Sequence, residues 1–230
     1  MFTWRDGQKF KRTVFSYDAN NSSHQSSRLS KQILDFSNIC TIQVKASLYG
    51  FQSYAYYPTW ILYEGFFTEN QHVMVTEKAE PTTARTNPSL ANYHNTYIFL
   101  SGGLNPGNGR ALTSCNTYSI RADKWARVPE LCQKRYFHSS CVVGDYVYVS
   151  CGMDGPNSFL NTLERLDAHA ILSGQPPPQS WEEVRVTDPN TFVPRRNPLM
   201  APLNDSQILI IGGYCVRNYY KGQGLIFDTK

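Results

Sequence analysis

A glycine-rich segment near the middle of the chain contains residue types that could cradle a phosphate group. Gly102 and Gly107 are separated by four residues, as at the start of a P-loop. A P-loop continues with Lys and then Ser or Thr, which contact the phosphates and a magnesium ion, whereas Asn108 and Gly109 follow here. The run Asn-Pro-Gly-Asn-Gly is instead typical of turns. The segment therefore predicts a backbone turn rather than a phosphate site.

Other residues that could do chemistry do not combine into a site. The five histidines lie far apart in the sequence, and the six cysteines form neither a CxxC pair nor a zinc pattern. Glu182 and Glu183 are neighbours on an expected strand, so their side chains point to opposite faces. No G-x-S-x-G nucleophile elbow occurs. The sequence predicts no catalytic residue, no metal site and no cofactor, and His138 is expected to be a hydrogen-bonded strand histidine.

Charge and composition narrow the class of function. The formal net charge is +4 over 230 residues, without the dense basic patch that binds nucleic acid. No apolar run is long enough to cross a membrane, and the first twelve residues have charged side chains with no apolar stretch behind them. We therefore expect no nucleic-acid partner, no membrane partner and no signal peptide. The cysteines are expected to be buried thiols in the cytoplasm.

Short β-strands are the elements that must position these residues. From residue 39 onward, short apolar runs alternate with Gly, Pro, Asn and Asp. Three of the runs end in the same way, in Gly-Gly or Cys-Gly: YIFLSGG, YVYVSCG and ILIIGG. The final glycines are Gly103, Gly152 and Gly213. Repeats of this size, each with several short strands, predict the blades of a β-propeller.

Large apolar residues keep the same register as the glycines. One follows each final glycine by 14 or 15 residues, and a tryptophan then follows the first two of them after 7 and 15 residues. The longer spacing reflects a Pro-rich insertion at 174–179. The apolar residues are Tyr118, Leu166 and Phe227, and the tryptophans are Trp125 and Trp181.

This pattern resembles the kelch repeat, in which a double glycine after the second strand is followed by an aromatic residue and a tryptophan at set distances. The resemblance covers roughly residues 40–230 and implies an all-β, kelch-type β-propeller that is partial, with three clear blades. In a fourth, degenerate blade, Gly50, Phe67 and Met74 would stand for the glycine, the aromatic residue and the tryptophan. The residues assigned to the structural kelch motif are Gly102, Gly103, Tyr118, Trp125, Cys151, Gly152, Leu166, Trp181, Gly212, Gly213 and Phe227.

Elementary physics gives these motif residues packing roles. Glycine lets one backbone pass close to another where a Cβ atom would clash. The aromatic residues and tryptophans are large enough to fill the wedge between neighbouring blades. The motif therefore predicts a stable scaffold rather than a reaction centre.

Three arginines also recur in register and form the candidate partner-binding set. Arg85, Arg135 and Arg196 precede the final glycines by 18, 17 and 17 residues. If the blades are equivalent, these cations form a ring on one face that could meet an acidic partner. In the alternative, which we favour, each arginine pairs with backbone carbonyls or with an acid of its own or the next blade.

The register divides the chain into five segments. An N-terminal strand and a Ser/Asn-rich connector are expected over 1–38, a degenerate blade over 39–84, and a blade over 85–134. A blade with the Pro-rich insertion is expected over 135–195, and an incomplete blade over 196–230. Trp4 could complete the last blade, although we favour the alternative that it closes a missing earlier one.

The resemblance implies a non-catalytic module that binds a partner protein through blade-face loops. An open arc of blades would also expose strand edges and apolar surface, which allows self-association. The alternatives are a kelch-propeller enzyme, such as a copper oxidase or a sugar-modifying enzyme, and a module that binds carbohydrate through exposed tyrosines.

Overall fold

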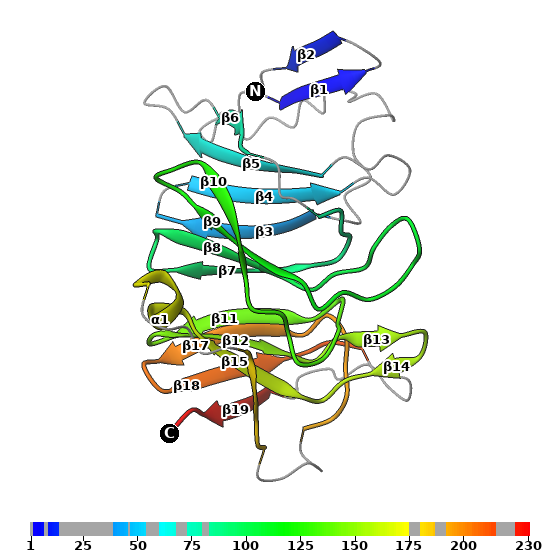
Figure 1. Ribbon diagram of the computed structural model, residues 1–230, viewed down its shortest axis with the longest axis vertical. Helices are drawn as coiled ribbons and strands as arrows, with labels where there is room; N and C mark the ends of the chain where they lie inside the picture. The colour runs from blue at the N-terminus through cyan, green and yellow to red at the C-terminus, as the bar shows by residue number, and fades with distance from the viewer. Residues whose placement is uncertain are drawn as a thin grey trace, which may run out of the picture.

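Regular structure in this chain is almost entirely β-strand. The computed structural model describes residues 2–6, 9–13, 39–45, 47–53, 60–67, 73–79, 83–174, 180–186, 192–214 and 224–230. Their strands form antiparallel sheets that lie one after another along the longest axis in Figure 1. The one helix of the described chain, α1 (Ala168–Leu172), is short. The expected all-β architecture is confirmed.

The first two large sheets, called blades A and B, are four-stranded meanders in which consecutive strands pair. Apolar residues alternate along their strands, so each blade has an apolar side facing the next blade. Blade A consists of β3 (Ile39–Val44), β4 (Ser47–Ser53), β5 (Trp60–Phe67) and β6 (Val73–Glu77), and blade B of β7 (Ser89–Tyr93), β8 (Tyr97–Ser101), β9 (Cys115–Ser119) and β10 (Lys124–Val128).

Blades C and D repeat this pattern with two variations. In blade C a small hairpin is inserted between the second and third strands, and blade D has three described strands instead of four. Blade C consists of β11 (Ser139–Val143), β12 (Tyr146–Ser150), β15 (Leu163–Asp167) and β16 (Glu182–Val184), its inserted hairpin of β13 (Met153–Gly155) and β14 (Ser158–Phe159), and blade D of β17 (Leu199–Asn204), β18 (Gln207–Ile211) and β19 (Gly224–Asp228).

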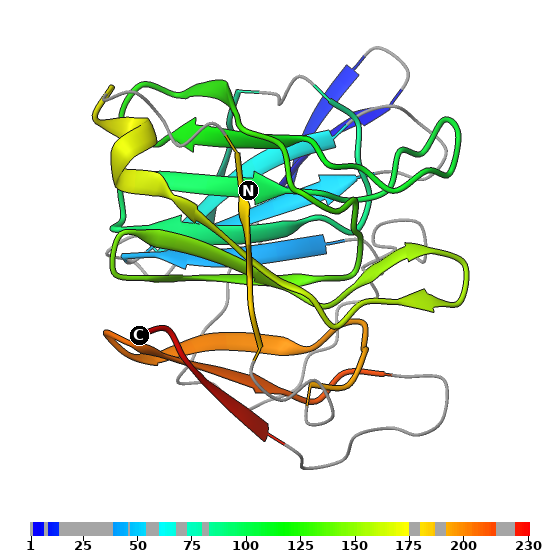
Figure 2. The ribbon, with the colours of Figure 1, turned by 60° about the horizontal axis from the view of Figure 1, so that its bottom comes forward.

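The first strands of successive blades lie side by side, which is the arrangement of a propeller. β7 lies between β3 and β11, and β11 lies between β7 and β17. Backbone hydrogen bonds join the segments that lead into these strands, from Phe137 N–H to the Asn87 carbonyl (3.1 Å) and from Asn197 N–H to the Phe137 carbonyl (2.7 Å). Figure 2 shows blade D at the lower edge of this arc. The four blades therefore form a partial propeller.

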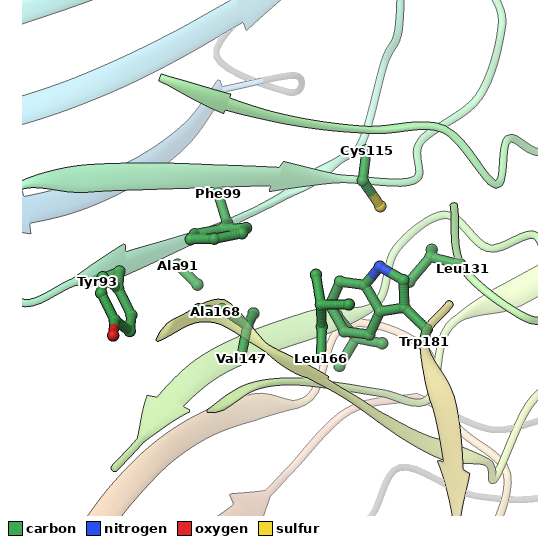
Figure 3. Packing of buried hydrophobic residues seen from close by; sticks show 10 residues of the cluster. Ala91, Tyr93, Phe99, Cys115, Leu131, Val147, Leu166, Ala168 and Trp181 are labelled. Carbon is green, nitrogen blue, oxygen red and sulfur yellow. The ribbon is translucent and has the colours of Figure 1, made fainter. Parts of the chain in front are cut away.

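The hydrophobic core lies between the blades rather than within them. One cluster packs blade A on B, a second packs B on C, and a third packs C on D. In the second cluster, Tyr93 and Phe99 of blade B meet Val147, Leu166 and Trp181 of blade C (Figure 3). Burial of apolar surface between blades is thus the main source of stability.

The N-terminal hairpin lies at the opposite end of the arc from blade D. β1 (Phe2–Asp6) pairs with β2 (Lys9–Thr13), so that Trp4 is opposite Lys11, and β1 contacts β6 of blade A. Figure 1 shows the two chain ends at opposite ends of the molecule. β1 therefore does not complete blade D, which agrees with the favoured alternative for Trp4. Residues 17–31 of the connector lie outside the described part of the chain.

Two local expectations differ from the structure. Gly50 lies inside β4, paired with Thr41 and Tyr63, so it does not follow the strand as the other glycines do. The register places Gly65, opposite Leu48, where the other blades have their large apolar residue, so Phe67 was assigned two residues too far along. The assignment was wrong because blade A has no glycine pair after its second strand from which the spacing could be counted.

Candidate functional site

The glycine pairs lie where one blade contacts the next. They follow the last residues of β8, β12 and β18 and so mark one end of each blade. We call this the glycine end; in Figure 1 it carries β13 and β14 and lies opposite α1. Gly103 and Gly152 have left-handed φ angles of 106° and 94°, which favour glycine. Their N–H groups donate to the carbonyls of Arg135 and Arg195 in the next blade, each at 2.8 Å. The glycine pair at 102–103 therefore connects the backbones of blades B and C.

The buried arginines of the glycine end bind the first residue of each pair. Arg85 donates from Nη1 to the Gly102 carbonyl (3.0 Å), and Arg135 donates to the Cys151 carbonyl (2.8 Å). The third member of this set is Arg195, which donates to the Gly212 carbonyl (3.1 Å). Arg196 was therefore assigned one residue too late. The shared sequence Arg-x-Asn-Pro at 85–88 and 195–198 is the signal that would have given the correct register.

Burial leaves these arginines unavailable to a partner. Arg85 and Arg135 have exposures of 0%, and Arg195 has 2%. Desolvation lowers the pKa of Arg85 to about 10. The structure therefore favours the alternative in which these cations pair within their own blades over a solvent-facing ring.

The acceptors that satisfy Arg85 and Arg135 differ between blades. In blade B, Nη2 of Arg85 donates to Oδ1 of Asn116 (2.8 Å). In blade C the equivalent residue is Glu164, which is 1% exposed and forms a buried ion pair with Arg135. The same carboxylate accepts the backbone N–H groups of Cys132 (2.7 Å) and Gln133 (3.1 Å). Glu164 therefore fixes both the arginine and the loop that enters blade C.

The motif tryptophans close the gap to the preceding blade. Trp125 packs in the cluster between blades A and B and donates its indole N–H to the Ala79 carbonyl (2.6 Å). Trp181 is 1% exposed, packs between blades B and C, and donates to the Pro129 carbonyl (2.9 Å). Tyr118, Leu166 and Phe227 share one register position, opposite the second residue of the second main strand of the blade. Tyr118 and Leu166 are fully buried, and Phe227 packs against the cluster between blades C and D, so these residues have packing roles.

His138 is buried between blades B and C. Its Nε2 lies 2.8 Å from the hydroxyl of Ser101, and Nδ1 meets no partner among the described residues. Burial, together with the positive charges of Arg135 and Arg85, holds the pKa of His138 well below its usual value. The imidazole is therefore neutral in the fold, as expected of a structural histidine.

Acid is expected to destabilise the protein through His138. The unfolded state binds this proton near pH 6.5 while the folded state resists it, so stability present above that pH is lost as the pH falls below it, by up to about 1.4 kcal/mol per pH unit. Urea unfolding between pH 7.5 and pH 5 should show this slope, and it should be shallower in His138→Gln. The exposed His169 supplies the control, because His169→Gln should keep the wild-type slope. Equal slopes in all three proteins would contradict this assignment.

A cation held between two aromatic rings lies at the surface of the glycine end. The guanidinium carbon of Arg196 lies 4.9 Å from the ring centre of Tyr214 and 5.5 Å from that of Phe137. Its Nη1 is 4.0 Å from the sulfur of Met153. Arg196, Phe137 and Tyr214, which we call the Arg196 cluster, are each half-buried. No ion pair among the described residues involves Arg196.

The backbone of Phe137 has a conformation that is unusual for a bulky residue. Its φ is 56°, and the equivalent residues Asn87 and Asn197 have φ angles of 53° and 51°. Asn tolerates this left-handed region, whereas an aromatic side chain is strained in it. Strained residues of this kind cluster at functional sites. Phe137 was not predicted from the sequence, because the sign of φ cannot be read from residue spacing at a non-glycine position.

Several other expectations concern single residue types. Cys115, Cys141 and Cys151 are buried free thiols, as expected, whereas the free thiol of Cys132 is exposed. In the described part of the chain, no three His, Cys, Asp or Glu side chains are grouped to hold a metal ion. No described helix has the length and apolar character needed to span a membrane. Residues 175–179 of the Pro-rich insertion lie outside the described residues.

Comparison with known proteins agrees with the repeated blades. The family model described as "Kelch motif" matches residues 134–168, the segment that carries Arg135, His138 and the Cys-Gly pair. A solved structure of YjhT has a TM-score of 0.60 to this chain at 13% identity, over 76% of this chain and 56% of the other. The fold is thus a partial β-propeller, and the chain carries a kelch motif over residues 134–168.

Two curated relatives match parts of the chain. Kelch-like protein 22 of Homo sapiens is 36% identical over 87 residues, which is 36% of this chain and 14% of the relative. Kelch-like protein 36 of Bos taurus is 24% identical over 122 residues, which is 53% of this chain and 18% of the relative. The chain therefore spans less than a fifth of each of these relatives.

Proposed function

We propose that this chain is a non-catalytic protein-interaction module that binds a partner protein through the loops of its glycine end. The observation that carries the proposal is the Arg196 cluster. Arg and Tyr are enriched among the residues that dominate binding energy at protein interfaces, and they act in partly enclosed, apolar surroundings. Arg196 offers a cation between two aromatic rings at the molecular surface.

The charge and strain of the cluster favour a partner with a carboxylate-bearing segment. Nε of Arg196 is buried and has no hydrogen-bond partner among the described residues. Of the three arginines expected from the sequence, only Arg196 is not fully enclosed, since Arg85 and Arg135 are 0% exposed. A carboxylate would satisfy the guanidinium, and apolar groups beside it would cover the rings of Phe137 and Tyr214.

Loss of the cation is expected to weaken partner capture without unfolding the protein. Proteins captured from cell extract by the immobilised wild-type chain should be reduced about tenfold or more with Arg196→Ala. Arg121, an exposed residue in the turn between β9 and β10 at the opposite end of blade B, supplies the matched control. Arg121→Ala should capture the same proteins as the wild type. Equal capture by both variants would overturn the proposal.

A second variant separates binding from folding. Phe137→Asn places at this position the residue that Asn87 and Asn197 already have in the same backbone conformation. Relief of left-handed strain offsets the lost ring contacts, so the free energy of unfolding should change by less than about 1 kcal/mol. Partner capture should still fall, because the ring beside Arg196 is gone.

We also propose that the chain acts in the cytoplasm and can associate with itself through an open blade edge. The buried free thiols of Cys115, Cys141 and Cys151 support a reducing compartment. The exposed apolar side chains of blade D support self-association. Fluorescence microscopy of the tagged chain tests the first of these statements.

A further inference from the structure

Each blade presents the same register positions to the blade that follows it. In blade B these positions are the third and fifth residues of the first strand and the third residue of the second strand, and the strand register gives their equivalents in the other blades. We call them the forward face. They are Ile42, Val44 and Tyr49 in blade A, Ala91, Tyr93 and Phe99 in blade B, Cys141, Val143 and Tyr148 in blade C, and Ala201 and Leu209 in blade D, where a register shift between Pro202 and Asn204 interrupts the remaining position and leaves Leu203 unpaired.

The forward face is buried wherever the next blade covers it. Val44 and Tyr49 are 4% and 2% exposed, and Tyr93 and Phe99 are 7% and 2% exposed. In blade C, Cys141, Val143 and Tyr148 belong to the cluster that packs against Met200, Ile208 and Ile210 of blade D. Three successive interfaces therefore use the same positions.

Blade D has an apolar forward face that no described blade covers. Leu203 is 46% exposed, and Ile226 on the neighbouring strand β19 is 58% exposed. Leu199 and Ile211, at the glycine end of the same sheet, are 55% and 36% exposed. These four are the large hydrophobic side chains found exposed among the described residues, and all belong to blade D. Several exposed apolar side chains on one sheet are typical of an association surface.

The glycine pair of blade D differs from the others in the same way. A Cβ atom added to Gly102 would lie less than 3.0 Å from the Arg135 carbonyl oxygen of the next blade. A Cβ atom added to Gly212, at the equivalent place, would meet no atom of the described residues within 4 Å. The close approach that makes glycine necessary in blade B is therefore missing at blade D.

We propose that this face of blade D docks onto the blade A end of a second copy of the chain. Every interface in the arc joins the forward face of one blade to the opposite face of the next, so the stacking has a direction. Within each copy, blades B, C and D each pack against the blade that precedes them, whereas the structure describes no blade that precedes blade A, only the β1–β2 hairpin beside β6. A head-to-tail contact continues the interface that is already repeated three times.

The proposal rests on the proposed self-association and is independent of partner binding at the glycine end. Light scattering on a size-exclusion column should show species larger than the 26.2 kDa monomer, growing with concentration. Ile226→Lys should raise the concentration of half-association at least about tenfold, because a charge would be buried at the contact. A wild-type chain that stays monomeric at all concentrations would overturn the proposal.

A matched substitution and a crosslinking measurement sharpen the test. Ala126 is an exposed residue on β10 of blade B, so Ala126→Lys adds the same charge away from the docking face and should associate like the wild type. In a mixture of isotopically distinct copies, crosslinks should join Lys230 after β19 to Lys9 or Lys11 in β2. Equal association of both Lys variants, or inter-copy crosslinks dominated by Lys230–Lys230, would refute the head-to-tail contact. Arg196→Ala should associate like the wild type, which separates this outcome from a failure of partner binding.

Discussion

Glu164→Ala is expected to lower the free energy of unfolding by about 3–5 kcal/mol, because it leaves a buried cation without its counter-charge. Arg135 has an exposure of 0% and Glu164 of 1%, so water cannot replace the lost carboxylate. The substitution also removes the acceptor for the backbone N–H groups of Cys132 and Gln133. A buried donor without a partner adds to the loss. Urea unfolding followed by circular dichroism measures the change.

Blade B provides a comparison that separates the contribution of the Glu164 charge from that of its hydrogen bonds. There Arg85 is satisfied by the amide of Asn116 and by backbone and hydroxyl oxygens of Ser114, without a carboxylate. Asn116→Ala should therefore cost about 1.5–3 kcal/mol, the value of a hydrogen bond from a charged donor to a neutral acceptor. The loss of unfolding free energy in Glu164→Gln should lie between these two values. The amide keeps one acceptor oxygen, but its NH2 group is a donor and cannot accept the N–H groups that the second carboxylate oxygen accepted. Equal losses in Glu164→Ala and Asn116→Ala would contradict the role assigned to the ion pair.

The repeated blades were predictable because two signals agree in the sequence. Apolar runs that end in Gly-Gly or Cys-Gly locate the second strand of blades B, C and D, and the large apolar residues Tyr118, Leu166 and Phe227 follow at one register position. Blade A lacks this marker: Gln52 and Ser53 still pair with β5 where the other blades have left-handed residues. Counting from Gly50 therefore placed its landmarks in the wrong register.

The surface site was less accessible to sequence reasoning than the scaffold. Arg195 and Arg196 are adjacent, and a count that tolerates one residue of variation cannot choose between a buried and a half-exposed cation. The partners of Arg196 come from separate loops, Phe137 before β11 and Tyr214 after β18. Only the stacking of blade C on blade D brings these rings together. Spacing within one repeat has no information on such contacts between repeats.

Gly102→Ala and Gly212→Ala are expected to differ although both change the first glycine of a pair. Both residues have left-handed φ angles, 54° and 67°, so each alanine pays about 1–2 kcal/mol of backbone strain. At Gly102 the new Cβ atom would also clash with the Arg135 carbonyl and with the ring of His138 in the next blade. The total loss for Gly102→Ala should reach about 3–5 kcal/mol, because backbone of a packed neighbour cannot move aside cheaply.

Cys151 shows that a side chain at this motif position is tolerated where there is room for it. It has a φ of 64° and an exposure of 0%, and its side chain belongs to the cluster between blades C and D. The close contact at Gly102, rather than the left-handed backbone alone, is thus what requires glycine. Urea unfolding of both variants, at protein concentrations below self-association, measures the difference. Equal losses would show that backbone conformation dominates, and that the joint between blades B and C is looser than its hydrogen bonds indicate.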